Sequence, residues 1–286
     1  MKQYYFIGLL VSILVILVIK YSVSESAREH TLKYEDVRGY IHQMVFANGV
    51  RSRALTWEVL PIPIYLDLHD AGIRSEIENS IRTIEYNVGI PIFLETSDYR
   101  QAKIFVVTSL VGQERLSDFF TRFLLEVLGP TWLELFQNKT PVLFDPKAYP
   151  QAPVHPCFTQ EFFTDASTQN DGGNRKPTQM LVFIGGVANI KSDILQECLV
   201  EELLHAAFFL RDAELIHGKH SIFNQFAHAE RARVPTPFDM CLILELLQGS
   251  FEATDFDKIA SSIYRKITNG ECPSWRVMSK PSPVKF

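Results

Sequence analysis

The residues best suited to chemistry lie in one short segment, Cys198-Leu-Val-Glu-Glu-Leu-Leu-His205. Glu201 and His205 are four residues apart, a spacing that puts two side chains on the same face of a helix, where both can bind one metal ion. Zinc peptidases with a His-Glu-x-x-His motif have their two histidine ligands at these positions and their general base second. Glu201 would then be the first ligand, Glu202 the base and His205 the second ligand.

A third ligand would have to come from the chain that follows the helix. Three further histidines lie within 24 residues of His205, namely His217, His220 and His228, and we take His220 as the candidate. The extended zinc motif has its third histidine six residues after the second, and that position is Arg211. A cation there would oppose metal binding if it faced the site, and otherwise would pair with Glu201 or Asp212. We therefore expect the domain to bind zinc weakly or not at all.

Other interpretations of the same residues stay open. The polar positions 196, 197, 201, 202 and 205 are the only ones between Ile194 and Leu210, and they form one arc, as on the solvated face of an amphipathic helix. They could also form a buried, hydrogen-bonded polar cluster. A cysteine hydrolase centred on Cys157, after His155-Pro156, would have no organised base.

The elements that must position these residues can be predicted from hydrophobic periodicity. Helices are expected at 25–48, 70–88, 117–128, 132–136, 192–210, 235–248 and 255–267, and strands at 57–68, 104–109 and 179–186. Pro61 and Pro63 favour an edge strand at 57–68, because proline cannot donate to a sheet ladder. Residues 145–177 are rich in Pro, Asn, Asp and Gly, which indicates a long loop or a lid. This mixture predicts an α+β domain.

The N-terminus indicates export. Residues 3–19 contain no charge and are flanked by Lys2 and Lys20, so residues 4–19 predict a membrane anchor or signal peptide that leaves 21–286 outside the cytoplasm. We expect four parts: a signal or anchor at 1–24, a membrane-proximal helix at 25–54, the main domain at 55–272 and a tail at 273–286. A net charge of −5 without a basic run argues against a nucleic-acid partner.

Four cysteines in an exported chain allow three full pairings. We favour a Cys157–Cys198 disulfide, because it would tie the Pro-rich loop to the start of the candidate helix. In the alternative, Cys198 and Cys241 are buried small hydrophobic residues, which suits Cys241 within the apolar run Met-Cys-Leu-Ile-Leu.

Four stretches carry a resemblance to a known family: Cys198 to His205, Leu210-Arg-Asp212, Ser221-Ile-Phe-Asn224 and Thr236-Pro-Phe-Asp239. Between about Trp57 and Gln248 the chain resembles exported bacterial proteins of domain of unknown function 2927 (DUF2927), which are grouped by fold with the zincin-like metallopeptidases. Seven residues match the family pattern: Cys198, Glu201, Glu202, Asp212, Ser221, Phe223 and Asn224. His205 departs from a usual Gln, and Arg211 departs from a usual Asn.

The resemblance implies a zincin-like domain with a mixed sheet and an active-site-type helix. In such a layout the strand at 179–186 would be the edge strand that borders the cleft, and Cys157, Cys198, Asp212, Ser221 and Asn224 would be structural. The family typically lacks both zinc histidines, which implies a degenerate site in which this chain restores one of them.

We accordingly expect a membrane-anchored or secreted protein of the cell envelope. Its degenerate metallopeptidase fold would act as a binding or scaffold module for a protein or peptide. The alternative is a zinc-dependent peptidase. In that case Glu201, His205 and His220 would hold zinc, and Glu202 would take a proton from the bound water.

Overall fold

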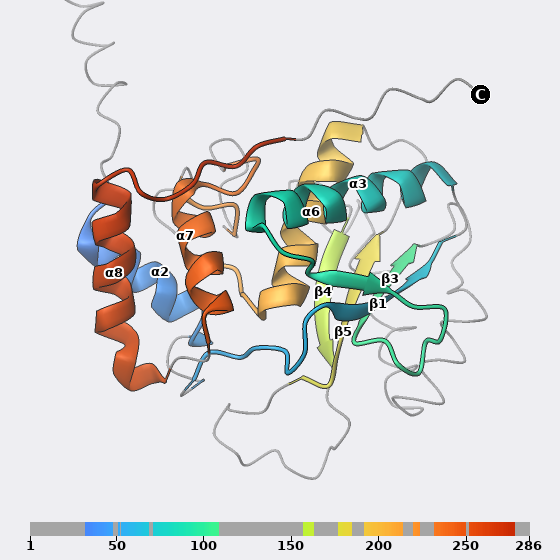
Figure 1. Ribbon diagram of the computed structural model, residues 1–286, viewed down its shortest axis with the longest axis horizontal. Helices are drawn as coiled ribbons and strands as arrows, with labels where there is room; N and C mark the ends of the chain where they lie inside the picture. Colours follow the sequence, from blue (N-terminus) through green and yellow to red (C-terminus); the bar gives the residue numbers. More distant parts are fainter. Residues whose placement is uncertain are drawn as a thin grey trace, which may run out of the picture. The chain divides into compact units, whose positions relative to one another are not determined.

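A five-stranded sheet with strand order β2-β1-β3-β5-β4 supports the site (Figure 1). Its strands are β1 (Ile62–Asp67), β2 (Phe93–Glu95), β3 (Ile104–Thr108), β4 (Cys157–Phe162) and β5 (Gln179–Ile184). The computed structural model describes residues 32–47, 51, 53–68, 71–108, 157–162, 177–184, 192–213, 220–223, 232–249 and 252–277. Within these, β2, β1, β3 and β5 run parallel, and β4 pairs antiparallel with β5. The fold is mixed α/β with a largely parallel sheet.

The central strands are apolar throughout, as expected for strands covered on both faces. In β3, residues 104–107 are all buried, and in β5 so are residues 180–184. The connection from β1 through α3 (Ala71–Val88) to β2 is a parallel crossover. The sequence analysis predicted this helix, in which Ile73, Ile77, Ile84 and Val88 are buried and Ile81 is partly exposed, but not the three-residue strand that follows.

Three predictions about the sheet were wrong. The strand at 57–68 is not an edge strand, because β1 lies between β2 and β3. Pro63 lacks an amide donor, but its carbonyl accepts from the Lys103 amide at 2.8 Å, just before β3 begins. The strand at 179–186 is also internal, since β4 lies outside β5. Finally, β4 lies within residues 145–177, for which we had predicted only a loop or a lid.

The helices of the described part of the chain form two groups (Figure 1). Helix α6 (Ser192–Phe208) packs with α3 and against β4 and β5, whereas α2 (Tyr34–Met44), α7 (Pro237–Leu247) and α8 (Phe256–Thr268) pack with one another beside it. The helices expected at 117–128 and 132–136 lie outside the described residues.

The helix expected next to the membrane belongs to the main body. Val37, Tyr40, Ile41 and Met44 of α2 are buried, and α2 packs against α8. The compact unit therefore begins at Tyr34 rather than at residue 55. None of the helices among the described residues is long and apolar enough to cross a membrane. The expected anchor at 4–19 lies outside the described residues.

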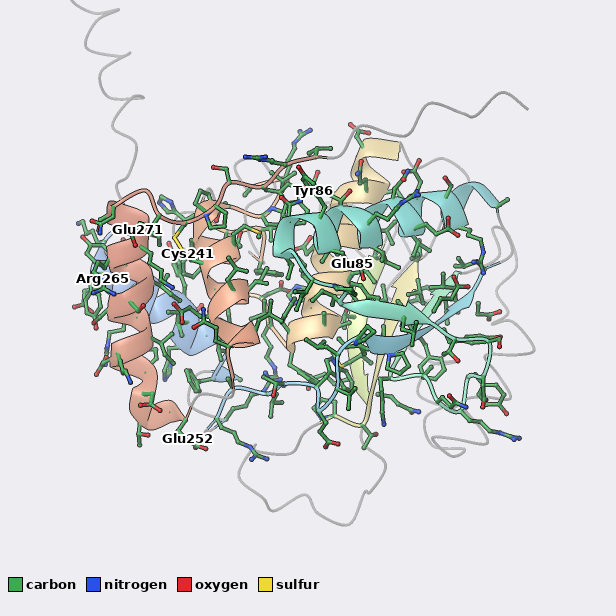
Figure 2. The ribbon with its side chains drawn as sticks, viewed as in Figure 1. Glu85, Tyr86, Cys241, Glu252, Arg265 and Glu271 are labelled. Carbon is green, nitrogen blue, oxygen red and sulfur yellow. A yellow bond between two sulfur atoms is a disulfide. The ribbon has the colours of Figure 1, made fainter. Side chains whose placement is uncertain are left out.

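Two disulfides join elements of the C-terminal half. Cys157–Cys198 links β4 to α6, with Cα atoms 6.0 Å apart, which confirms the favoured pairing. Cys241–Cys272 links α7 to the segment after α8, with Cα atoms 5.3 Å apart, so Cys241 is not a free buried thiol (Figure 2). Disulfides form and persist in oxidising compartments, and the two bonds indicate an extracytoplasmic protein.

Candidate functional site

Helix α6 is buried on the face that carries the candidate residues. Glu201 and His205 are only 5% and 7% exposed, although both are polar. The interpretation of this arc as a solvated helix face is therefore wrong for these two residues, and the buried polar cluster is the arrangement found. Burying a carboxylate next to an imidazole is costly unless each is paired, so the partners of these groups define the site.

The edge strand is fastened to α6 immediately beside these residues. The Cys157–Cys198 disulfide lies one turn before Glu201, and the Thr159 hydroxyl donates a hydrogen bond to the carbonyl of Glu202 at 3.0 Å. Cys157 is thus committed to a disulfide and cannot serve as a nucleophile. One covalent and one hydrogen bond hold β4 against the helix.

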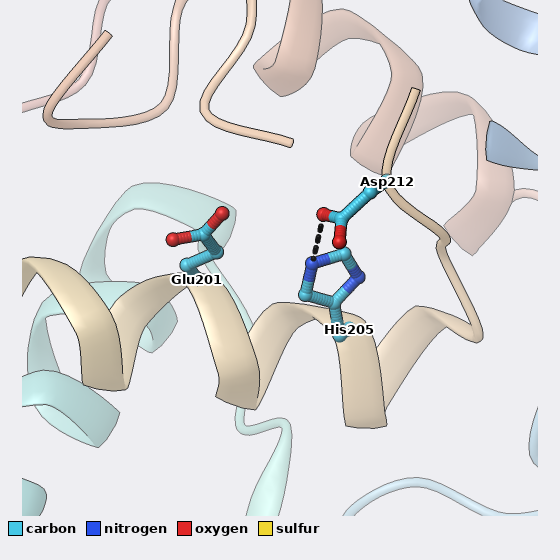
Figure 3. A group of neighbouring side chains, drawn as sticks. All are labelled: Glu201, His205 and Asp212. Carbon is cyan, nitrogen blue, oxygen red and sulfur yellow. Dashed lines mark ion pairs between the residues drawn. The ribbon is translucent and has the colours of Figure 1, made fainter. Parts of the chain in front are cut away.

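A tight turn after α6 brings a second carboxylate back to the helix. Phe209 has φ +52°, the left-handed conformation with which many helices end. The carbonyl of Leu210 then lies 2.8 Å from His205 Nδ1, and Asp212 Oδ1 lies 3.2 Å from His205 Nε2. Figure 3 shows Asp212 over the imidazole ring, with Glu201 one turn earlier on the same helix.

Among the residues that the structure describes, Glu201, His205 and Asp212 form a group that could hold a metal ion. Each offers one ligand atom, and these atoms all lie within 4.8 Å of one another. The third member is Asp212, which lies seven residues after His205, and not His220 as predicted. We refer to these three residues as the 201–205–212 cluster.

The charge state of His205 depends on its carboxylate neighbours. Burial alone would lower its pKa, but the hydrogen bond and negative charge of Asp212, together with the charges of Glu202 and Glu201, raise the pKa to about 10. The ring also packs edge-on against Phe223, with centroids 4.8 Å apart. Without a metal ion, His205 is therefore an imidazolium that donates to Asp212 and to a backbone carbonyl.

Arg211 does not pair with the cluster as we had expected. Its guanidinium lies 3.3 Å from Glu161 Oε2 on β4. The other oxygen of Glu161 accepts from Arg51 at 2.6 Å. Arg211 thus pairs with the edge strand, and its cation is held by Glu161 instead of facing the cluster.

Two further predicted residues, His220 and Ser221, contact the start of α7. The carbonyl of His220 accepts a hydrogen bond from the Thr236 hydroxyl at 2.7 Å, and the Ser221 hydroxyl donates to Asp239 Oδ1 at 2.5 Å. Ser221 thus lies in a buried hydrogen-bonded contact with α7, and its assignment as structural stays a prediction. Asn224, His217, His228 and His155 lie outside the described residues.

The sequence analysis gave Arg51 and Glu161 no part in the site, and it did not predict Asp212 as a metal ligand. Asp212 had a signal, because it matched a family motif close to the helix. Arg51 and Glu161 had none, since they lie 158 and 50 positions from the turn residues that they contact.

No protein-family model matches the sequence, and no curated protein matches it either.

Proposed function

We propose that this extracytoplasmic protein has a zincin-like fold and binds one divalent metal ion, zinc in the first instance, through the 201–205–212 cluster. The observation that carries the proposal is the convergence of one imidazole nitrogen and two carboxylate oxygens within 4.8 Å. The edge strand fastened beside α6 is β4, whereas the resemblance implied the strand at 179–186 in that place.

The donor set suits a metal ion chemically. Zinc sites that carry out chemistry use three protein ligands from imidazole and carboxylate groups and leave one position open. The contact between Nδ1 of His205 and the Leu210 carbonyl is of the kind that orients a ligating histidine and leaves Nε2 for the metal. Two carboxylates with a neutral imidazole carry a charge of −2, which a divalent ion would neutralise.

A bound ion of this kind would lower the pKa of a coordinated water and polarise a substrate carbonyl. The chain would then need a group that accepts a proton. Glu202 follows Glu201 directly on α6 and is partly exposed, and its backbone carbonyl is held by Thr159. We assign the role of general base to the Glu202 carboxylate, in a peptidase-type hydrolysis.

A second candidate is a binding or scaffold module without a metal. It is favoured by the state of His205, because both of its ring nitrogens already have partners within the protein. In that reading the cluster is a satisfied ion-pair network within a degenerate metallopeptidase fold, and the protein would act by binding a protein or peptide.

Metal content distinguishes the two candidates. The full chain is purified with its disulfides intact, dialysed against zinc and then against metal-free buffer, and analysed for metal. We expect one equivalent of zinc, lost in His205→Ala and Asp212→Asn and retained in Asp193→Asn, an exposed carboxylate at the start of α6. No retained zinc, together with no change in the visible spectrum of added Co²⁺, would leave the binding module as the better proposal.

The role of Glu202 needs a separate measurement. Glu202→Gln should retain the metal and abolish peptide hydrolysis, because the amide cannot accept the proton. Loss of metal in this variant would instead make Glu202 a ligand.

The attachment to the membrane is also a proposal. We propose that residues 4–19 anchor the protein in the membrane, with residues 21–286 outside the cytoplasm, because the run is uncharged and flanked by lysines. A reporter enzyme that works only in the cytoplasm, fused to Phe286, should be inactive, and an active fusion would refute this location. N-terminal sequencing that begins near Glu25 would identify a cleaved signal instead.

A further inference from the structure

Arg51 is a buried cation that the proposed site does not use. Its side chain is 3% exposed, and the residue belongs to the segment that connects α2 to β1 in the sequence. Nη1 donates to the carbonyl of Phe209 at 2.6 Å, and Nη2 donates to Glu161 Oε1, also at 2.6 Å. One guanidinium therefore joins the end of α6, the edge strand and the N-terminal part of the chain.

The carbonyl that Arg51 holds belongs to the turn on which the cluster depends. Phe209 is the residue with φ +52°, a conformation that residues with a side chain keep only when their surroundings enforce it. The next carbonyl, that of Leu210, contacts the His205 ring, and Asp212 follows two residues later. The Phe209 ring is held separately, against Trp57 at a centroid distance of 4.6 Å.

Glu161 extends the same support to the other side of the turn. Its second carboxylate oxygen accepts from Arg211, which directly precedes Asp212. The Arg211 amide donates to the Met44 carbonyl at 3.0 Å, at the end of α2. The segment from Phe209 to Arg211 is thus held at its backbone by Arg51 and Met44 and at the Arg211 side chain by Glu161.

We propose that Arg51 is a positioning residue of the site: its guanidinium, clamped by Glu161, fixes the turn at Phe209 and so sets the place of Asp212 relative to His205. The planar guanidinium can donate in two directions at once, whereas a lysine ammonium is a single point on a flexible stem. The consequence for metal affinity rests on the proposed function, but the effect on the turn does not.

The test compares three variants of the full chain: Arg51→Met, Arg51→Lys and the matched control Arg53→Met, an exposed arginine two residues away. Hydrogen–deuterium exchange is followed without metal in peptides that cover residues 209–213 and α8, and the dissociation constant for zinc is measured separately. Far-UV circular dichroism and disulfide mapping verify the fold.

We expect Arg51→Met to speed exchange at the Arg211 and Ala213 amides at least tenfold, while α8 exchanges as in the wild type. It should weaken zinc binding by 10- to 100-fold, a usual effect for a group that orients ligands. Arg51→Lys should lie between Arg51→Met and the wild type, and Arg53→Met should stay within twofold of the wild type. A merely structural role would speed exchange in α8 as well.

Unchanged exchange in residues 209–213 of a folded Arg51→Met protein would overturn the proposal, as would equal acceleration in α8. If Arg51→Met does not fold, Glu161→Gln decides, because it weakens the clamp on both arginines and leaves their backbone contacts in place. A tenfold rise in exchange confined to 209–213 supports the proposal, and no rise refutes it. If the wild type binds no zinc, the proposed function fails, and the exchange data alone judge Arg51.

Discussion

Replacing Ser221 with alanine tests how the segment after α6 is attached to α7. The Ser221 hydroxyl donates to Asp239 Oδ1 at 2.5 Å and accepts from the Phe223 amide at 3.1 Å, and Ser221 and Asp239 are both fully buried. The substitution removes a donor from a buried carboxylate and an acceptor from a buried amide. A hydrogen bond to a charged group contributes about 1.5–3 kcal/mol. We therefore expect Ser221→Ala to lower the free energy of unfolding by about 2–3 kcal/mol at pH 7.5.

The cost should depend on pH in a defined direction. Burial raises the pKa of Asp239 to about 6, while hydrogen bonds from Ser221, Thr236 and Ile222 restrain the rise. Without Ser221 the pKa of Asp239 in the folded state is higher still. Because the folded pKa then exceeds the unfolded value by more, lowering the pH through 6 stabilises the variant more than the wild type. The cost of Ser221→Ala is thus largest above pH 7 and shrinks towards pH 5.

Urea denaturation of the oxidised protein at pH 7.5 and pH 5.0 measures both quantities. Ser261→Ala, at an exposed position on α8, is the control and should change the free energy of unfolding by less than about 0.5 kcal/mol. The reasoning is refuted if Ser221→Ala costs no more than this control at pH 7.5, or if its cost grows as the pH falls.

Three further substitutions probe other contacts by the same titration. The double variant Cys157→Ser/Cys198→Ser opens a bridge with a sequence separation of 41, and the free energy of unfolding should fall by about 4 kcal/mol in the chain-entropy model. Trp57→Phe keeps an aromatic ring but loses the 3.1 Å hydrogen bond from the indole N–H to the Ala206 carbonyl of α6, which should cost about 1 kcal/mol. Lys266→Met leaves Glu245, with its side chain only 10% exposed, without its ammonium partner, at a cost of about 1–2 kcal/mol. If a variant has the same urea midpoint and the same slope of free energy against urea concentration as the wild type, the prediction for that variant is contradicted.

Local pattern was enough to predict the helix that carries the site. The apolar positions of α6 recur at helical spacing, and Glu201 and His205 share a face for the same geometric reason. The apolar strands β3 and β5 and the Cys157–Cys198 pairing were also predictable, because each depends on a short run of residues or on a small number of alternatives.

The features that were missed depend on distant partners. Asp212 meets His205 only because Phe209 takes a left-handed conformation, which no local signal demands of a phenylalanine. The edge position of β4 depends on its pairing with β5, and a strand in a Pro-rich region has no periodicity of its own to reveal it. The internal place of β1 likewise follows from β2, whose three residues are too few to show a pattern.

The two disulfides also determine how the chain would respond to a pulling force. Both covalent loops lie C-terminal to residue 156, with sequence separations of 41 and 31, whereas β1, α3, β2 and β3 lie outside them. A fully extended chain spans about 3.3–3.6 Å per residue. The two closed loops therefore shorten the extended length of the chain by roughly 240 Å until a reductant opens the disulfides. A force along the chain can therefore extend β1, α3, β2 and β3 completely. Under the same force, the edge strand stays attached to α6, and α7 stays attached to the segment that follows α8.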